Sequence, residues 1–196
     1  MRLFAAVVPP SSVIGELEPV VRGLEEMPEA ERLRWTGRPG WHFTLAFYGE
    51  VAEEVVPELS ERLARAARRT EPFRLALGGG GHFGGRTLWV GASGDTGVMG
   101  LLADRAEAAA RKAGVETGEY RPYRPHLTLA RSRRHSEDLR PYVAALDSFA
   151  GREWTVGELC LIRSHLPGAG APGEQPRYET VERWALGAGG SLGAGG

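Results

Sequence analysis

A five-residue pattern of alternating side chains occurs twice in this chain and constrains its fold most strongly. Residues 42–46 read HFTLA and residues 126–130 read HLTLA. Successive side chains of a β-strand point to opposite faces of the sheet. In each copy the His and Thr therefore share one face, while the large apolar side chains share the other. The repeat predicts two strands, each with an apolar face toward the core and a His/Thr face toward a groove or solvent.

The segments around the two motifs alternate between strand and helix patterns. Apolar runs and period-two alternation predict strands, and apolar stripes at helical spacing predict helices. The order is strand-helix-strand-helix-strand, roughly repeated, which suggests two α+β lobes that each carry one motif strand. The expected strands cover residues 3–8, 33–35, 41–48, 73–77, 87–90, 126–132, 154–163 and 178–186, and the expected helices cover 13–27, 53–69, 98–113 and 136–150.

Two glycine-rich segments interrupt this order. Residues 78–85 contain six glycines and His82, and they lie between two expected strands, which favours a flexible hairpin connection. The run lacks the Gly-Lys-Ser/Thr ending of a phosphate-binding loop, and a strand rather than a helix is expected to follow. Residues 187–196 are expected to form a disordered Gly-rich tail without function, which leaves residues 1–186 as a single domain.

The charge of the chain is balanced overall but uneven locally. The formal net charge is −1, so no global field attracts nucleic acid or a membrane. Five arginines nevertheless lie within residues 121–134, which contain no acidic residue. This patch suits a phosphate-bearing substrate, although a solvated arginine-rich loop would look the same. Its members are Arg121, Arg124, Arg131, Arg133 and Arg134.

Few residues remain for other kinds of site. Cys160, the one cysteine of the chain, lies in an apolar run and is expected to be a buried thiol, so no internal disulfide can form. The apolar run at 3–8 is too short to span a membrane, and a cytoplasmic location is the expectation. The two His could in principle serve zinc, but no Asp, Glu or Cys lies at ligand spacing beside either motif.

Two histidines that face one cleft can act as a general acid and a general base. Their ordinary pKa lies near 6.5, so both protonation states are accessible near neutral pH. Thr44 and Thr128 lie on the same faces as His42 and His126 and can donate hydrogen bonds to phosphate oxygens. The four residues could cleave a phosphodiester without a metal. Two other hypotheses remain: a chance recurrence of the motif, and a non-catalytic RNA-binding module with stacking aromatics at Trp35, Trp41, Tyr48 and Tyr178.

The sequence resembles the two-histidine (2H) phosphoesterase superfamily, and within it the bacterial and archaeal RNA 2',3'-cyclic phosphodiesterases, also named the 2'-5' RNA ligase family. The resemblance extends over nearly the whole chain. It depends on the two motifs with their flanks, together with the opening strand, a middle hairpin and a C-terminal signature. The matching segments are residues 2–6, 41–50, 83–91, 124–131, 161–166 and 178–184.

The resemblance implies an α+β fold of two pseudo-symmetric lobes, each an antiparallel sheet with flanking helices, with the active-site cleft between them. It implies metal-independent hydrolysis of RNA 2',3'-cyclic phosphate ends to the 2'-phosphate, with no cofactor. Reversible 2'-5' RNA ligation could accompany this hydrolysis, and turnover of a small cyclic phosphate, such as ADP-ribose cyclic phosphate, is an alternative. The expected partners are RNA ends or nucleotides, with no membrane, and the protein is expected to be a monomer.

The resemblance also implies roles for individual residues. His42 would be the proton donor to the departing 3'-oxygen and His126 the proton acceptor that activates water. Residue types alone do not assign these two roles, because the motifs are nearly symmetric. Arg131 would assist in substrate binding, although strict alternation points it away from the His face. Tyr48, which alternation places on the His face, stands where the family often has Leu and is a further candidate substrate contact.

Overall fold

The computed structural model describes residues 1–168 and 173–187 of the 196-residue chain. The strands are β1 (Arg2–Val7), β2 (Leu33–Trp35), β3 (Phe43–Glu50), β4 (Phe73–Phe83), β5 (Thr87–Gly94), β6 (Leu127–Ser132), β7 (Trp154–Val156), β8 (Glu158–His165) and β9 (Arg177–Ala185). The α-helices are α1 (Ser11–Glu25), α2 (Val56–Arg68), α3 (Thr96–Lys112) and α4 (Arg140–Leu146). Short 3-10 helices are η1 (Ala30–Arg32), η2 (Arg38–Gly40) and η3 (Glu53–Val55).

The strands form one antiparallel sheet that is nearly divided in the middle. Its order is β7-β4-β5-β6-β3-β1-β8-β9, with β2 also paired to β6. The two motif strands, β3 and β6, are neighbours at the centre, and a single residue pair, Phe43 with Leu127, joins them. This narrow junction separates the sheet into two halves. The predicted α+β fold with two lobes is confirmed.

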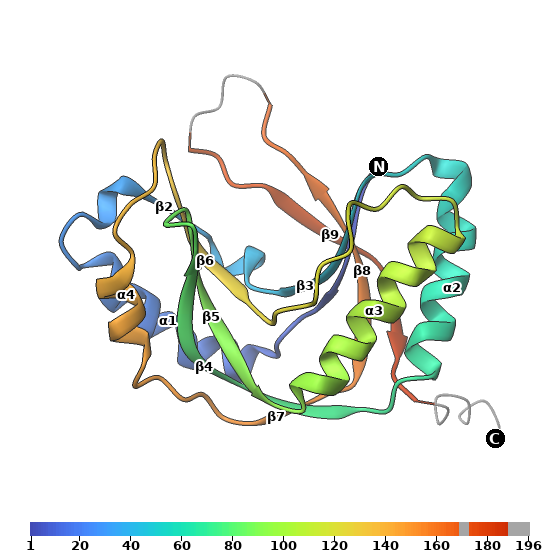
Figure 1. The fold of residues 1–196 in the computed structure, drawn as a ribbon, viewed down its shortest axis with the longest axis horizontal. Helices are drawn as coiled ribbons and strands as arrows, with labels where there is room; N and C mark the ends of the chain where they lie inside the picture. The colour runs from blue at the N-terminus through green and yellow to red at the C-terminus, as the bar shows by residue number, and fades with distance from the viewer. Residues whose placement is uncertain (169–172, 188–196) are drawn as a thin grey trace.

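Each half of the sheet carries its own helices (Figure 1). One lobe consists of β3, β1, β8 and β9 with α2 and α3, and the other consists of β7, β4, β5, β6 and β2 with α1 and α4. The lobes interleave along the chain, because β1 belongs to the first and α1 to the second. The two sequence halves therefore do not correspond to the two lobes, although each lobe has one motif strand at its inner edge.

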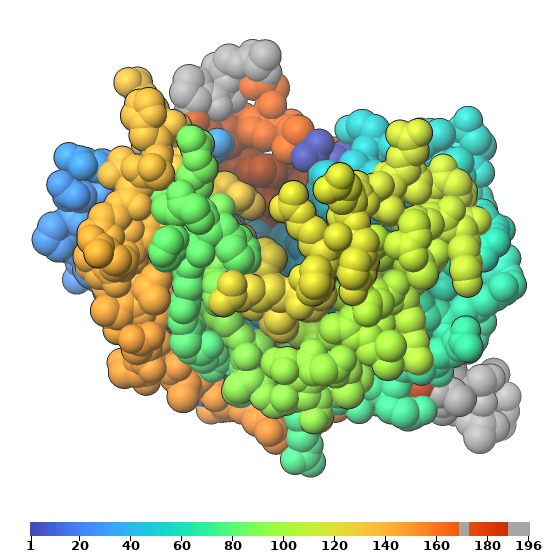
Figure 2. All heavy atoms as spheres, viewed as in Figure 1, coloured from blue at the N-terminus to red at the C-terminus, as the bar shows by residue number. Residues whose placement is uncertain are grey.

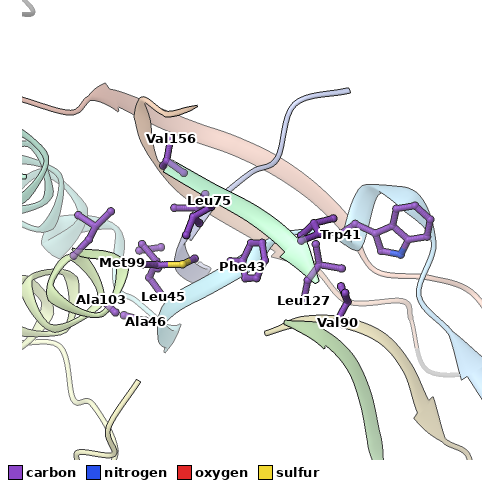
Figure 3. Packing of buried hydrophobic residues seen from close by; sticks show 14 of the residues in the cluster. Trp41, Phe43, Leu45, Ala46, Leu75, Val90, Met99, Ala103, Leu127 and Val156 are labelled. Carbon is purple, nitrogen blue, oxygen red and sulfur yellow. The ribbon is translucent and has the colours of Figure 1, made fainter. Parts of the chain in front are cut away.

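The apolar faces of the motif strands form part of the core. Phe43 and Leu127 are fully buried beside each other, and Leu45 lies near Met99 of α3 (Figure 3). Burying a side chain of this size stabilises the fold by roughly 1.5–3 kcal/mol relative to leaving it exposed. Burial of the alternate side chains holds the intervening His and Thr residues on the opposite, open face.

A bulge in β3 overturns the predicted orientation of Tyr48. The pairing of β3 with β1 shifts register between Ala46 and Thr44, so one extra residue enters at Leu45. Such a bulge reverses the alternation beyond it. Phe47 is therefore 51% exposed, whereas Tyr48 is 4% exposed and its hydroxyl donates a hydrogen bond to the Ala106 carbonyl of α3. Burial raises the pKa of Tyr48. The prediction that Tyr48 contacts substrate is wrong, because Tyr48 belongs to the core.

The glycine run at 78–85 is largely strand rather than flexible loop. β4 extends to Phe83 and pairs with β5 across Gly80 and Gly81. The indole of Trp89 lies against Gly81, where an added Cβ would stand 2.2 Å from the ring. Gly81 therefore allows Trp89 to pack closely against the strand, and Gly80 allows the same for Leu146. His82 belongs to β4, and its Nδ1 accepts a hydrogen bond from the Gly85 amide.

Among the other segments, two differ most from prediction. The helix expected over 136–150 is confined to α4, which begins after Leu139 and has Pro141 near its start. The strand expected over 154–163 is divided at Gly157 into β7 and β8, and these belong to different lobes. Of the expected tail, only Gly187 lies within the described residues. No helix in the described part of the chain is both long enough and apolar enough to cross a membrane.

Candidate active site

Both motifs contribute to one small pocket between the lobes. The pocket has a volume of about 90 Å³, and its lining includes His42, Thr44, His126 and Thr128. The pairing of Phe43 with Leu127 explains why they meet. In an antiparallel pair centred on these residues, each His lies beside the other strand's Thr. The junction thus acts as a local twofold axis that brings two identical His/Thr sets around one space.

Aromatic rings hold His42 in one lobe. His42 directly precedes β3, and its ring stacks on Phe4 of β1 with centroids 4.8 Å apart. The edge of Tyr178 of β9 completes the contact at 5.1 Å. The buried surroundings lower the pKa of His42 to about 4, an effect that a hydrogen bond with the Pro39 backbone only partly offsets. His42 is therefore neutral at pH 7 when the pocket holds no anion.

His126 has a corresponding aromatic environment in the other lobe. Phe83 meets its ring edge-on at 4.9 Å, and Trp89 lies 6.2 Å away. The Nδ1 atom of His126 is 2.7 Å from the carbonyl oxygen of Arg124. Because a carbonyl only accepts, the neutral imidazole carries its proton on Nδ1 in this contact and presents Nε2 as an acceptor.

Cations distinguish His126 from His42. Burial lowers the pKa of His126, and the nearby charges of Arg131 and Arg124 lower it further, while the hydrogen bond to the Arg124 carbonyl opposes the shift. No cation contributes in this way to the pKa of His42. Desolvation is therefore the main reason that both histidines favour the neutral form, and two positive charges add to this effect at His126 alone.

Arg131 reaches the pocket although strict alternation points it away. The pairing of β6 with β5 shifts register between Leu88 and Trp89, where Leu129 is the extra residue of β6. The resulting bulge turns Arg131 to the pocket lining, where its guanidinium donates to the Thr87 hydroxyl at 3.2 Å. Leu129 is the counterpart of Leu45 in β3, so both motif strands have a bulge directly after the Thr.

The remaining arginines of the basic patch do not all face the pocket. The guanidinium of Arg124 lies over the Trp89 ring, 5.2 Å from its centroid. Arg133 instead donates to the Glu31 carbonyl. Arg121, Arg133 and Arg134 are exposed and do not line the pocket. Two arginines of the patch therefore belong to the site. Arg131 lines the pocket, and the backbone carbonyl of Arg124 contacts His126.

Comparison with known proteins places this geometry in a family. A model described as the 2'-5' RNA ligase superfamily matches residues 9–167. The chain belongs to this superfamily. Curated relatives named RNA 2',3'-cyclic phosphodiesterase occur in Thermus thermophilus, with 32% identity over 95% of this chain and 90% of the relative, and in Escherichia coli, with 30% identity over 94% and 96%. A Geobacillus stearothermophilus relative of the same name is 31% identical, and the match covers 78% of this chain and 47% of that protein.

Solved structures of the superfamily share the fold. A Thermus thermophilus protein superposes with a TM-score of 0.75 at 28% identity, covering 97% of this chain and all of that one. Escherichia coli LigT complexed with 3'-AMP superposes with a TM-score of 0.73 at 28% identity, covering 94% and 97%. The structural match extends over both lobes and confirms the family that the sequence resembles.

The sequence did not predict Thr36, Gly40 or Tyr178 as part of the catalytic pocket of this superfamily member. Tyr178 was expected only as a stacking aromatic of an RNA-binding module. A Cβ on Gly40 would meet Thr36 Cγ2 at 2.6 Å and Tyr178 at 3.4 Å, so only glycine lets these side chains approach. Tyr178 arrives through the pairing of β9 with β8, in which it lies opposite Ser164. No local pattern relates Tyr178 to a motif more than a hundred residues earlier in the chain.

The cysteine of the chain, another potentially reactive group, lies outside this pocket. Cys160 is 4% exposed, as predicted, and burial raises its pKa to about 11. A thiol with such a pKa is a poor nucleophile at neutral pH. In the part of the chain that the structure describes, no three His, Cys, Asp or Glu residues gather as a set of metal ligands.

Proposed function

We propose that this protein hydrolyses RNA or nucleoside 2',3'-cyclic phosphate ends to the 2'-phosphate, with His42 and His126 as the acid and base. The observation that carries the proposal is the small pocket between the lobes, which two His and two Thr from symmetry-related strands line. The names of relatives at 30–32% identity that align over nearly their whole length agree with this reaction class.

In the proposed reaction His126 Nε2 accepts a proton from water as the water oxygen forms a bond to phosphorus. The bond from phosphorus to O3' breaks, and protonated His42 gives its proton to the departing oxygen. The products are a free 3'-hydroxyl and a 2'-phosphate. The hydroxyls of Thr44 and Thr128 and the guanidinium of Arg131 stabilise the negative charge on the non-bridging oxygens. Each hydrogen bond to a charged oxygen is worth about 1.5–3 kcal/mol.

Burial lowers the pKa of His42 to about 4, so His42 would act as the acid only with phosphate bound, whereas the cations beside His126 agree with its role as base. A base must be neutral, and Arg124 and Arg131 favour the neutral form of His126. An acid must be protonated when substrate is bound, and no cation lowers the pKa of His42. A bound phosphate would bring a negative charge beside His42 and raise its pKa. Bound substrate would thus produce the protonated form of His42, while the guanidinium of Arg131 binds phosphate oxygens.

A direct assay tests the proposal. The purified protein is incubated with an oligoribonucleotide ending in a 2',3'-cyclic phosphate, in the presence of excess EDTA. The expected product is the 2'-phosphate end, resolved from the 3'-phosphate by chromatography against synthetic standards. Binding without turnover would instead support an RNA-binding module, and loss of turnover on EDTA addition would contradict the metal-free reaction.

The lowered pKa values predict an unusual pH dependence. Turnover requires one protonated and one neutral His, and in the free protein both pKa values lie below the ordinary 6.5. Because kcat/KM reports the free protein, its maximum is expected below pH 6.5, with a decline as pH rises through neutrality. The maximum of kcat is expected at higher pH, because bound phosphate raises the pKa of His42. Profiles of both constants between about pH 4 and 9 check this, and coinciding maxima above pH 7 would contradict it.

A further inference from the structure

A groove leads away from the phosphate pocket along the sheet of the β8–β9 lobe. Its first section, of about 410 Å³, shares His42 and Tyr178 with the pocket. Its second section, of about 460 Å³, shares Val8, Ser11 and Thr180 with the first. Each volume falls within the range of about 300–1,000 Å³ that is usual for ligand sites. Because they share lining residues, the three spaces adjoin one another.

The groove lies on the side of the sheet away from the main core. Phe4, Cys160 and Ile162 form a separate apolar cluster there, with Tyr178 packed against it. Val8, which lines both sections, remains 48% exposed at the end of β1. Figure 2 shows the surface hollowed between the lobes, with the orange-red β8–β9 hairpin behind the hollow. The floor of the groove is therefore apolar and open to a ligand, which suits the faces of ribose and base rings.

The walls of the groove supply donors for anions. Arg183 is exposed, and none of the ion pairs in the described part of the chain involves it. Ser11, the first residue of α1, lines the same section as Arg183, and the first turn of that helix has neither an acidic residue nor a side-chain cap. The positive end of the helix dipole therefore adds to the charge of Arg183.

The length of the groove limits what it can hold. Tyr178 and Arg183 lie five residues apart on β9, a span of roughly 16 Å in extended chain. This exceeds the length of one nucleotide. Glu158 lines the far section together with Arg183, and a carboxylate there opposes a further phosphate. The groove thus suits a short stretch of an extended polymeric ligand rather than a long one.

We propose that this groove binds the RNA nucleotides that precede the cyclic-phosphate end, with Arg183 and Ser11 facing their phosphodiesters. The inference rests on the function proposed above, because it takes the phosphate pocket as the end of the chain. The protein would then prefer an oligonucleotide end to a free nucleotide, and the preference would reach its limit after a few nucleotides, where Glu158 ends the favourable charge.

The test compares substrates of increasing length. Values of kcat/KM are measured for one nucleoside 2',3'-cyclic phosphate and for di-, tri- and tetranucleotides that end in the same group. The expected result is an increase of about tenfold or more from mono- to trinucleotide, since contacts with charged groups are individually strong, and little further gain for the tetranucleotide. The gain is expected to shrink as salt rises, because part of it is electrostatic.

Two variants test whether the RNA follows this groove. Arg183→Gln removes the cation, and Ser11→Asp adds a carboxylate that opposes phosphate but is favourable for the helix, so its thermal stability should not fall. Each is expected to bring the ratio of tri- to mononucleotide kcat/KM close to one. The matched control is Arg68→Gln, an exposed arginine of α2 that lines none of the three spaces and should preserve the wild-type ratio.

The possible outcomes separate this inference from the proposed function. Turnover of the mononucleotide with no gain from added length overturns the groove and leaves the phosphodiesterase intact. A gain that survives in both groove variants also overturns it, because the chain would then follow another surface. Absence of turnover on every substrate overturns the proposed function itself, and the groove proposal with it.

Discussion

Replacing His126 by alanine is expected to lower kcat on a 2',3'-cyclic phosphate by about 10²–10⁴-fold, the usual contribution of a general base. The variant loses the Nε2 acceptor that the contact between Nδ1 and the Arg124 carbonyl orients. Its fold should persist, because the core-facing neighbour Leu127 is unchanged. Rates measured under saturating substrate, together with a thermal melt, check both statements.

The controls for this variant separate chemistry from structure. His135→Ala removes an exposed imidazole outside the pocket and should retain wild-type kcat. Added imidazole should restore part of the activity of His126→Ala, because a small base can enter the vacated space and accept the proton from water. A kcat within about tenfold of wild type for His126→Ala would show that this side chain is not the base.

The second large effect concerns His42 and the leaving group. His42→Ala is expected to lose a similar factor of about 10²–10⁴ on the natural cyclic phosphate, because the departing 3'-oxygen then leaves without a proton. The loss should be much smaller on a nucleotide p-nitrophenyl phosphodiester, whose leaving group is stable as an anion. His126→Ala should remain impaired on both substrates, since water still requires a base.

This comparison decides which histidine plays which role. The motifs are nearly symmetric, so residue types alone leave the assignment open. If the p-nitrophenyl substrate rescues His126→Ala and not His42→Ala, the acid and base are reversed. If it rescues neither variant, proton donation to the leaving group is not what either side chain contributes.

Much of the site follows from local periodicity. Alternation over a few residues placed His42 with Thr44, and His126 with Thr128, opposite the buried Phe43 and Leu127, and the pocket lining agrees with that arrangement. The main helices are also local features, because an apolar stripe at helical spacing needs only its own segment. Monomeric state and cytoplasmic location stay predictions.

Pairing between strands determined what alternation could not. The bulges at Leu45 and Leu129 depend on the hydrogen bonds that β3 and β6 make with their neighbours. After each bulge the faces exchange, so Tyr48 enters the core and Arg131 reaches the pocket. A prediction that continues strict alternation through these points must place both side chains on the wrong face.

The sequence by itself determined that this chain carries a His/Thr face on each of two strands, because the period of a strand can be read from a few residues. Only the tertiary structure decided that one residue pair joins those strands, that Tyr178 of the distant β9 lies beside His42, and that two arginines lower the pKa of one histidine and not of the other. These features depend on burial and on contacts between segments far apart in the chain. Neither can be read from a pattern of a few neighbouring residues.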